Sequence, residues 1–327
     1  MITIRYITPF FGKLPDYFQL WLDSCKTNPS IDWLVVTDDH SCYDYPSNVQ
    51  VLYCSFDDIK TRIQKIYPFE ITLDSAYKLV DYKVAYGEIF KEELADYDFW
   101  GFCDIDLIWG NIRRFFTDEV LLSYPKIGCQ GHSTIFKNEP TINAIYRMPI
   151  DGEIGYEEVF TTNKICCTDI GFIRKRFEKN NLPIFDETIY AGLDAYSPSF
   201  FLQAMPEEDA YKNRRQVFLW NNGQLLRYYL LKGEIVEEEY YYIHFFKRPM
   251  KNRINDMSIP ILIVPNKFFN YNEKITYEIV NRYGKKSKIS FYLRMAYQNR
   301  KKISIMKIIE YLQFQLKHNH ANRKYLN

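Results

Sequence analysis

The sequence predicts an α/β fold in which a mostly parallel sheet is flanked by helices. In the first half of the chain, short apolar stretches typical of strands alternate with stretches of helical spacing, an order typical of parallel sheets covered by helices. Hydrophobic residues make up 47% of the 327 residues, which is enough for a sizeable core. Polar residues follow four of the predicted strands, where ligands bind in such sheets.

The elements of the first half follow one another without long interruptions. Apolar runs predict strands over 2–8, 33–37, 49–53 and 98–103. Bulky residues at helical spacing predict helices over 17–25, 59–67 and 77–91. The polar segments that close the strands are expected to converge on one crevice, and they are 9–12, 38–39, 55–58 and 104–106.

The second half of the chain is less regular. Apolar stretches predict strands over 126–136 and 235–246. Asn221, Asn222 and Gly223 separate two further apolar runs. They predict the turn of a hairpin, because Asn and Gly tolerate the positive φ that such turns require.

The C-terminal region differs from the rest of the chain in charge. No clean linker precedes it, so we expect one catalytic domain over 1–270 and a basic, amphipathic helical region over 271–327. Residues 281–327 include twelve basic residues and one acidic residue, although the net charge of the whole chain is +1. This basic and partly apolar segment favours contact with an anionic membrane surface rather than with nucleic acid. The alternative is a helix that packs its apolar face on the core and leaves a solvated basic face.

The cysteine pattern and the N-terminal sequence indicate where in the cell the protein is expected. The seven cysteines are odd in number and form no C-x-x-C pair, which fits neither a zinc site nor a disulfide framework. The sequence starts without a signal-peptide pattern and contains no run of 18 apolar residues. We therefore expect a cytoplasmic protein with buried, reduced thiols, peripheral at the inner face of the cell membrane if its basic region binds there.

Two carboxylates flank one apolar residue at the end of a strongly apolar strand. Asp104 and Asp106 follow the apolar run 99–103 and precede the apolar run 107–109. Two unpaired carboxylates are costly in such surroundings, and a hard divalent cation that binds a diphosphate prefers one or two carboxylate ligands. The pattern favours a metal site, with Mn²⁺ or Mg²⁺ as the expected ion. The alternative is a solvated loop with two acidic residues.

An aromatic strand late in the chain delivers a single histidine. His244 follows the tyrosine run 240–242, and Lys247 comes three residues later. Neutral imidazole is a suitable ligand for manganese, and lysine is a compact positive charge suited to a diphosphate. Taken alone, this pattern favours the alternative of a core histidine with a surface lysine.

Several short motifs together resemble a known enzyme group. The sequence carries Pro-Phe-Phe-Gly, Tyr-Lys-x-x-Asp-x-Lys, Tyr-Asp-Phe-Trp-Gly-x-x-Asp-x-Asp, Gly-His and His-Phe-x-Lys-Arg, at 9–12, 77–83, 97–106, 131–132 and 244–248. Over residues 1–250, these motifs resemble GT-A-fold glycosyltransferases of bacterial capsule and O-antigen clusters. The late His and Lys are similar, more remotely, to those of the retaining family 8 enzymes.

The resemblance implies a GT-A fold, a nucleotide-sugar donor and a divalent metal. It implies that Asp104, Asp106 and His244 bind the metal and that Lys247 contacts the diphosphate. It gives nucleotide-sugar-binding roles to a set of residues, namely Pro9, Phe10, Phe11, Gly12, Asp38, Lys78, Asp81, Lys83, Asp104 and His132. For Lys78 and Asp81, an ion pair within the helix is an equal alternative. Asp169 would touch the transferred sugar or the acceptor.

These features predict a hexosyltransferase of surface polysaccharide synthesis. The expected donor is a UDP-hexose, and the resemblance implies retention at the sugar and a lipid-linked saccharide acceptor. An inverting enzyme would need a general base, for which Asp169 and Asp194 are the candidates. One alternative is a sugar nucleotidyltransferase, although the segment 9–13 has one glycine instead of the Gly-rich loop expected there. Another is a non-catalytic carbohydrate-binding protein, which leaves the acidic pair and the His-Lys pair unexplained.

Overall fold

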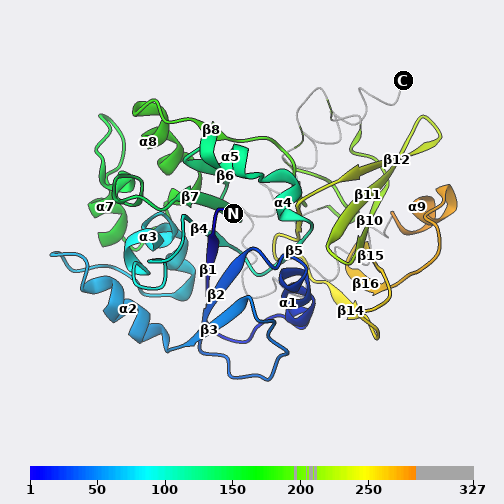
Figure 1. Cartoon of the computed structure of the whole chain (residues 1–327), viewed down its shortest axis with the longest axis horizontal. Coiled ribbons are helices and arrows are strands. Elements are labelled where there is room, and N and C mark those ends of the chain that lie inside the picture. The colour runs from blue at the N-terminus through cyan, green and yellow to red at the C-terminus, as the bar shows by residue number, and fades with distance from the viewer. Residues whose placement is uncertain (195–196, 204, 206–208, 210–211, 285–327) are drawn as a thin grey trace, which may run out of the picture. The chain divides into compact units, whose positions relative to one another are not determined.

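The described part of the chain forms two compact units (Figure 1). The structure is a computed structural model that describes residues 1–194, 197–203, 205, 209 and 212–284. Unit 1 comprises Met1–Ala191, Trp220–Leu225 and Glu239–Lys247, and unit 2 comprises Gly192–Leu219, Leu226–Glu238 and the chain from Arg248 onward. The domain boundary expected near residue 270 falls inside unit 2. The basic segment of the expected C-terminal region, 285–327, lies outside the described residues.

The central sheet of unit 1 mixes parallel and antiparallel strands. Its order is β3-β2-β1-β4-β7-β6-β8, with the bounds Ile4–Phe10 (β1), Asp32–Thr37 (β2), Val49–Tyr53 (β3), Phe99–Cys103 (β4), Lys126–Gln130 (β6), Ser133–Lys137 (β7) and Ile184–Phe185 (β8). Strands β3, β2, β1 and β4 are parallel, β7 is antiparallel to β4 and β6, and β8 is parallel to β6. The α/β class is therefore confirmed, but the mostly parallel sheet is corrected to a mixed one.

The sheet is mixed because one expected strand is in fact two. The apolar stretch 126–136 contains a turn at Gly131 and His132, so β6 and β7 form a hairpin. Two strands joined by so short a turn pair antiparallel. Because Ser133 pairs with Cys103, the turn brings His132 to the carboxyl end of β4. The stretch 235–246 is likewise divided between two strands, β12 and β13.

Helices lie on both sides of this sheet. Unit 1 contains α1 (Phe18–Lys26), α2 (Phe56–Gln64), the 3-10 helix η1 (Ala76–Ala85), α3 (Tyr86–Ile89), α4 (Ile112–Phe115), α5 (Asp118–Ser123), α6 (Pro140–Asn143), the 3-10 turn η2 (Ile145–Arg147), α7 (Tyr156–Thr161), the π-helical turn η3 (Thr168–Phe172) and α8 (Ile173–Lys179). Figure 1 shows α2, α3, α7 and α8 on one side and α1 on the other. The helix expected over 77–91 is a 3-10 helix followed by one α-helical turn.

Alternate residues of the central strands enter two different cores. On one face, Ile7 and Leu34 pack with residues of α2, α3, α7 and α8 in a large apolar cluster. On the other face, the rings of Tyr6 and Trp33 stack with centroids 5.9 Å apart, and Trp109 packs against both. A sheet that is buried on both faces holds its strand ends rigidly, which suits a site built from several strands.

Most residues of a six-stranded sheet belong to unit 2, whereas its hairpin end, Trp220–Leu225, and Glu239 are assigned to unit 1. Its order is β12-β11-β10-β15-β16-β14, with the bounds Gln216–Asn221 (β10), Gln224–Leu231 (β11), Glu234–Glu239 (β12), Lys251–Arg253 (β14), Ile261–Val264 (β15) and Lys267–Asn270 (β16). The expected hairpin turn is confirmed, because Asn222 and Gly223 have φ values of 44° and 88°. Val217, Leu262 and Val280 belong to one apolar core, to which helix α9 (Tyr277–Tyr283) contributes Val280.

The described residues also test two expectations, that no helix spans a membrane and that the thiols are buried. Within the described residues, no helix is both long enough and apolar enough to cross a membrane. Cys25 and Cys103 are buried free thiols, as expected. Cys42 and Cys167 are also free but lie exposed, so the expectation of buried thiols is only partly correct.

Candidate metal centre

Two neighbouring strands bring three metal-binding side chains together. Asp104 and Asp106 lie between β4 and β5 (Leu107–Trp109). Strand β13 (Tyr242–His244) pairs antiparallel with β5 and places His244 opposite Leu107. The N–H of Phe245 donates to the carbonyl of Asp106 at 2.8 Å, which fixes His244 beside that aspartate.

The three side chains form one compact group, the candidate metal group, which we call the metal group below. The ligand atoms of Asp104, Asp106 and His244 all lie within 4.8 Å of one another. His244 Nε2 is 3.0 Å from Oδ1 of Asp106 and 3.6 Å from Oδ2 of Asp104. His244 is buried, whereas the Asp104 side chain is 35% exposed, so the group is reached from the Asp104 side. Two carboxylate oxygens and one imidazole nitrogen fit a divalent cation.

Asp106 is held in its ionised form. Burial alone would raise the pKa of this carboxyl group, but the charge and hydrogen bond of His244 lower it. The backbone N–H of Lys247 also donates to Oδ2 of Asp106 at 2.5 Å. Together these contacts bring the pKa of Asp106 to about 2. The carboxylate is therefore ready to bind a cation at neutral pH.

A second histidine lies behind the first. The rings of His132 and His244 stack with centroids 4.2 Å apart, and Nδ1 of His132 is 2.6 Å from the hydroxyl of Tyr242. Burial, with smaller effects from His244 and Lys83, lowers the pKa of His132 well below its usual value. The neutral His132 ring therefore packs against the His244 ring and restricts its orientation, as groups that contact metal ligands often do.

A lysine bridges one carboxylate of the group to a buried aspartate. Lys83 Nζ lies 2.8 Å from Oδ1 of Asp104, 3.4 Å from Oδ2 of Asp169 and 2.6 Å from the carbonyl of Gly131. Burial would lower the pKa of Lys83, but the two carboxylates raise it above its usual range. At Gly131 an added Cβ would lie 2.3 Å from the Asp169 carboxylate, so any other residue there would require this carboxylate to move. Lys83 thus occupies one oxygen of Asp104 and leaves Oδ2 facing His244.

A strained turn follows the histidine. Phe246 and Lys247 have φ values of 51° and 58°, and two consecutive non-glycine residues in this region are energetically unfavourable. Both side chains are exposed, and Lys247 Nζ lies 4.1 Å from the centre of the Tyr77 ring. The turn therefore directs the Lys247 amide to Asp106 and its ammonium toward the exposed ring of Tyr77.

The sequence matches the model of one protein family. Residues 6–272 match the model of a family of unknown function, DUF6625. The chain belongs to this family. No protein with a curated description matches the chain. The matched span includes each residue of the metal group in this DUF6625 member, together with Lys83, His132, Asp169 and Lys247.

In this DUF6625 protein, the end of β1 and the residues that follow it lie level with the metal group. Thr8 Oγ1 is 3.1 Å from Cys103 Sγ, and the same register places Pro9 level with Asp104. Gly12 has a φ of 95°, and its N–H donates to Asp38 Oδ1 at 2.7 Å. Of the residues expected to bind the nucleotide, Pro9 and Phe10 therefore end β1, and Phe11 and Gly12 follow it, where Asp38 holds Gly12 by a hydrogen bond.

Lys78 and Asp81 lie away from the metal group. Their charged groups are 2.8 Å apart, and their side chains are 3% and 0% exposed. The structure therefore contains the ion pair that was the alternative to donor contact, and neither charge is accessible to a donor. In a 3-10 helix residues three apart align along one face, whereas Lys83, two residues after Asp81, lies on another.

One residue of the site was missing from the sequence prediction. Tyr242 contacts His132, and it lies two residues before His244, on the same face of β13. Strand alternation could have indicated it, but only with the knowledge that His132 lies opposite. That proximity depends on the β6–β7 hairpin, which the apolar pattern of 126–136 does not reveal.

Proposed function

We propose that this protein is a metal-dependent glycosyltransferase of the GT-A type that transfers a hexose from a nucleotide-sugar, with UDP as the expected nucleotide, to a saccharide acceptor. The observation that carries the proposal is the convergence of Asp104, Asp106 and His244 at the carboxyl end of the parallel half of the sheet. Ligands bind at this edge of α/β sheets. The motif resemblance supports the same assignment.

The residues of the site suit the departure of a diphosphate. Breaking a glycosyl–phosphate bond builds negative charge on the leaving group, so electrostatic stabilisation is the main catalytic need. Asp104, Asp106 and His244 would hold Mn²⁺ or Mg²⁺, which supplies positive charge to that diphosphate. Lys247 is exposed beside the group, and its ammonium would bind a phosphate oxygen. Residues 9–12, at the end of β1, would lie against the nucleotide.

The surroundings of Asp169 favour a retaining reaction. Asp169 and Asp194 were the two carboxylates proposed as the base of an inverting enzyme; Asp194 is buried, and the Asp169 side chain is 4% exposed and paired with Lys83. A general base must reach the proton that it removes, and this carboxylate is enclosed. We therefore assign Asp169 to the support of Lys83 and not to contact with the acceptor.

The acceptor and the location rest on the sequence. We propose a lipid-linked acceptor at the cytoplasmic face of a membrane, because the segment 285–302 is dense in basic residues interleaved with apolar ones. The segment lies outside the described residues. Anionic vesicles should co-sediment the full chain more strongly than a chain that ends at Gly284, and equal sedimentation of the two would contradict this location.

A panel of nucleotide sugars tests the proposed function. The purified protein should release a nucleoside diphosphate from at least one UDP- or GDP-hexose when Mn²⁺ is present and not when it is chelated. A sugar nucleotidyltransferase would instead consume a nucleoside triphosphate and release pyrophosphate. The Asp96→Asn variant, which is exposed and precedes the amino end of β4, should behave as the wild type. Asp106→Asn should fold and lose nearly all turnover, and retention of more than about a tenth of the activity would contradict the assignment.

A further inference from the structure

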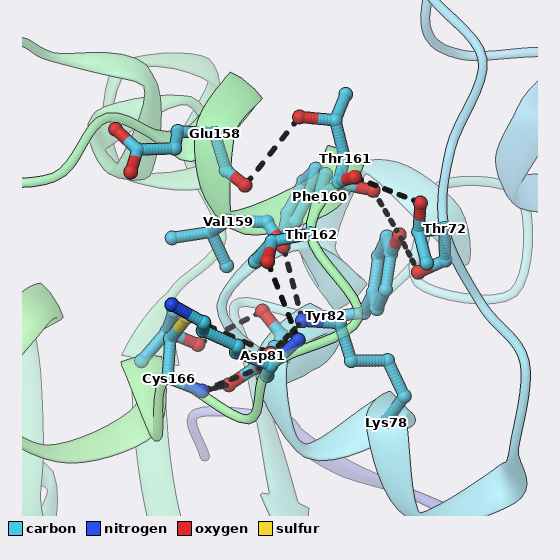
Figure 2. Close-up of polar contacts among 12 residues, drawn as sticks. Thr72, Lys78, Asp81, Tyr82, Glu158, Val159, Phe160, Thr161, Thr162 and Cys166 are labelled. Atoms are coloured by element: carbon cyan, nitrogen blue, oxygen red, sulfur yellow. Dashed lines mark hydrogen bonds and ion pairs between the residues drawn. The ribbon is translucent and has the colours of Figure 1, made fainter.

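A buried ion pair in η1 is linked to another part of the chain (Figure 2). Lys78 Nζ lies 2.8 Å from Oδ2 of Asp81, 3.0 Å from the carbonyl of Val159 and 2.5 Å from the carbonyl of Lys164. An ammonium group has three donors, and each of them has an acceptor here. Two of the three acceptors lie more than 80 residues away in sequence, in the segment 159–168.

Asp81 is linked to the same segment. Both of its carboxylate oxygens accept from the N–H of Cys166, at 3.1 and 3.0 Å, and its carbonyl accepts from the hydroxyl of Thr168 at 2.8 Å. The neighbouring Tyr82 hydroxyl donates to the carbonyl of Phe160 at 3.1 Å. As Figure 2 shows, Lys78, Asp81 and Tyr82 all bind the stretch that runs from the end of α7 toward η3.

This segment leads directly to the metal group. Cys167, between the two residues that Asp81 binds, has a left-handed backbone with a φ of 52°, and Asp169 follows two residues later. Asp169 lies 3.4 Å from Lys83, and Lys83 binds Oδ1 of Asp104 at 2.8 Å. The position of the Asp104 carboxylate therefore depends on Lys83, and that of Lys83 depends on where the segment places Asp169.

The cost of the pair argues for a role beyond packing. Moving two charges out of water is expensive, and apolar residues of similar size often stabilise a core as well or better. An apolar pair would not, however, make the four directional bonds to Val159, Lys164 and Cys166. Compared with an apolar pair, the ion pair therefore fixes the position of the backbone in the segment 159–168.

We propose that Lys78 and Asp81 are positioning residues of the metal centre, which hold the segment 159–168 so that Asp169 and Lys83 orient the Asp104 carboxylate toward His244. The proposal rests on the metal site of the proposed function. It assigns a role to the Lys-x-x-Asp-x-Lys motif as a whole, because the first two residues place the partner that the third requires. No sugar is involved, so the proposal can be tested with Mn²⁺ alone.

The main test replaces the pair by apolar residues and measures Mn²⁺ affinity by calorimetry. Lys78→Met combined with Asp81→Leu removes both charges and should leave a folded protein, judged by its circular dichroism and a cooperative melting transition. We expect Mn²⁺ affinity to fall by roughly ten- to a hundredfold, as when the partners of metal ligands are lost. The matched control is Arg62→Met with Glu93→Leu, which removes another ion pair of unit 1 and should not change the affinity.

A milder pair of variants keeps the test decisive if the double variant does not fold. Thr168→Val removes only the hydroxyl that donates to Asp81, and Thr168→Ser keeps it. We expect Thr168→Val to weaken Mn²⁺ binding and Thr168→Ser to restore it. Wild-type affinity in the folded double variant, or in Thr168→Val if the double variant does not fold, would overturn the proposal.

The outcomes separate this proposal from the proposed function. A wild type that binds Mn²⁺ but releases no nucleoside diphosphate from any donor would contradict the glycosyltransferase assignment and leave the positioning test intact. Sugar transfer with unchanged Mn²⁺ affinity in the Lys78 and Asp81 variants would overturn only the positioning role. A wild type that binds no Mn²⁺ would overturn both.

Discussion

Unit 1 contains two groups of charged residues that look alike in sequence and differ in structure. Lys78 and Asp81 are enclosed, and every donor of the ammonium is bound by the chain itself. In the metal group, Asp104 is 35% exposed and its Oδ2 faces Asp106 and His244 across a space small enough for one ion. In the first group the opposite charges of Lys78 and Asp81 neutralise each other. In the second, two carboxylates and an imidazole face one shared space.

The difference shows how to separate structural from functional charges. An enclosed pair with complete hydrogen bonding stabilises one backbone arrangement, because removal of one partner leaves an unpaired buried charge. Two carboxylates that converge with an imidazole repel each other until a cation binds between them. The same residue types therefore predict different responses to mutation. Substitution of the enclosed pair should cost stability and weaken metal binding only through the backbone that the pair holds, whereas substitution in the convergent group should remove metal ligands directly.

The largest expected effect is on stability, at the enclosed pair. Lys78→Ala leaves the Asp81 carboxylate buried without its cation and should lower the free energy of unfolding by about 3–5 kcal/mol in urea denaturation. The control is Lys137→Ala, which breaks the exposed pair with Glu139 and should cost at most about 1 kcal/mol. Equal losses of stability in the two variants would contradict the structural role of the enclosed pair.

The next effect is stabilisation by metal, at the convergent group. Mn²⁺ and UDP at about a hundred times their dissociation constant should stabilise the wild type by about 2.7 kcal/mol, because they bind the folded state alone. The rise in melting temperature should disappear in Asp106→Asn and persist in Asp96→Asn. A rise of the same size in Asp106→Asn would place the metal elsewhere.

A smaller effect is expected in acid. The folded pKa of Asp106 is about 2, below the usual 3.8, so its ionised form contributes stability that is present above about pH 4. This contribution is lost as the pH falls from 4 toward 2, where the carboxylate takes up a proton in the folded state. In metal-free protein, Asp106→Asn should therefore lose less stability than the wild type over this range. Identical acid denaturation curves would contradict the prediction.

The smallest effect is expected for Asp104. Its side chain is partly exposed and shares Lys83 with Asp169, so Asp104→Asn should change the free energy of unfolding by no more than about 1 kcal/mol. The same variant should bind Mn²⁺ much more weakly. A large loss of stability with unchanged Mn²⁺ affinity would assign Asp104 to the structural class instead.

The sequence predicted well whatever depended on local patterns. The strand Val49–Tyr53 was predicted to the residue, and the end of β4 before Asp104 was also correct, because apolar runs that end in polar residues mark buried strands. The Asn222–Gly223 turn followed from the backbone preferences of those residues. The association of His244 with the acidic pair came from the resemblance and not from any local pattern.

The failures have a common cause in contacts between distant residues. Nothing local in 126–136 shows the turn at Gly131, where the proximity of the Asp169 carboxylate disfavours any other residue. The helix 77–91 was expected to be one α-helix, and it is a 3-10 helix followed by a single α-helical turn. The pairing of Lys83 with Asp169 joins residues 86 positions apart once the chain has folded. Periodicity cannot predict such pairs.

The coordination of manganese by His244 tests the central claim most directly. Electron spin-echo measurements on bound Mn²⁺ detect the magnetic coupling of a coordinated imidazole nitrogen. The wild type should show this coupling, His244→Gln should lose it, and His40→Gln, which removes an exposed ring stacked on Tyr53, should retain it. Absence of nitrogen coupling in the wild type, or its persistence in His244→Gln, would contradict a metal centre formed by Asp104, Asp106 and His244.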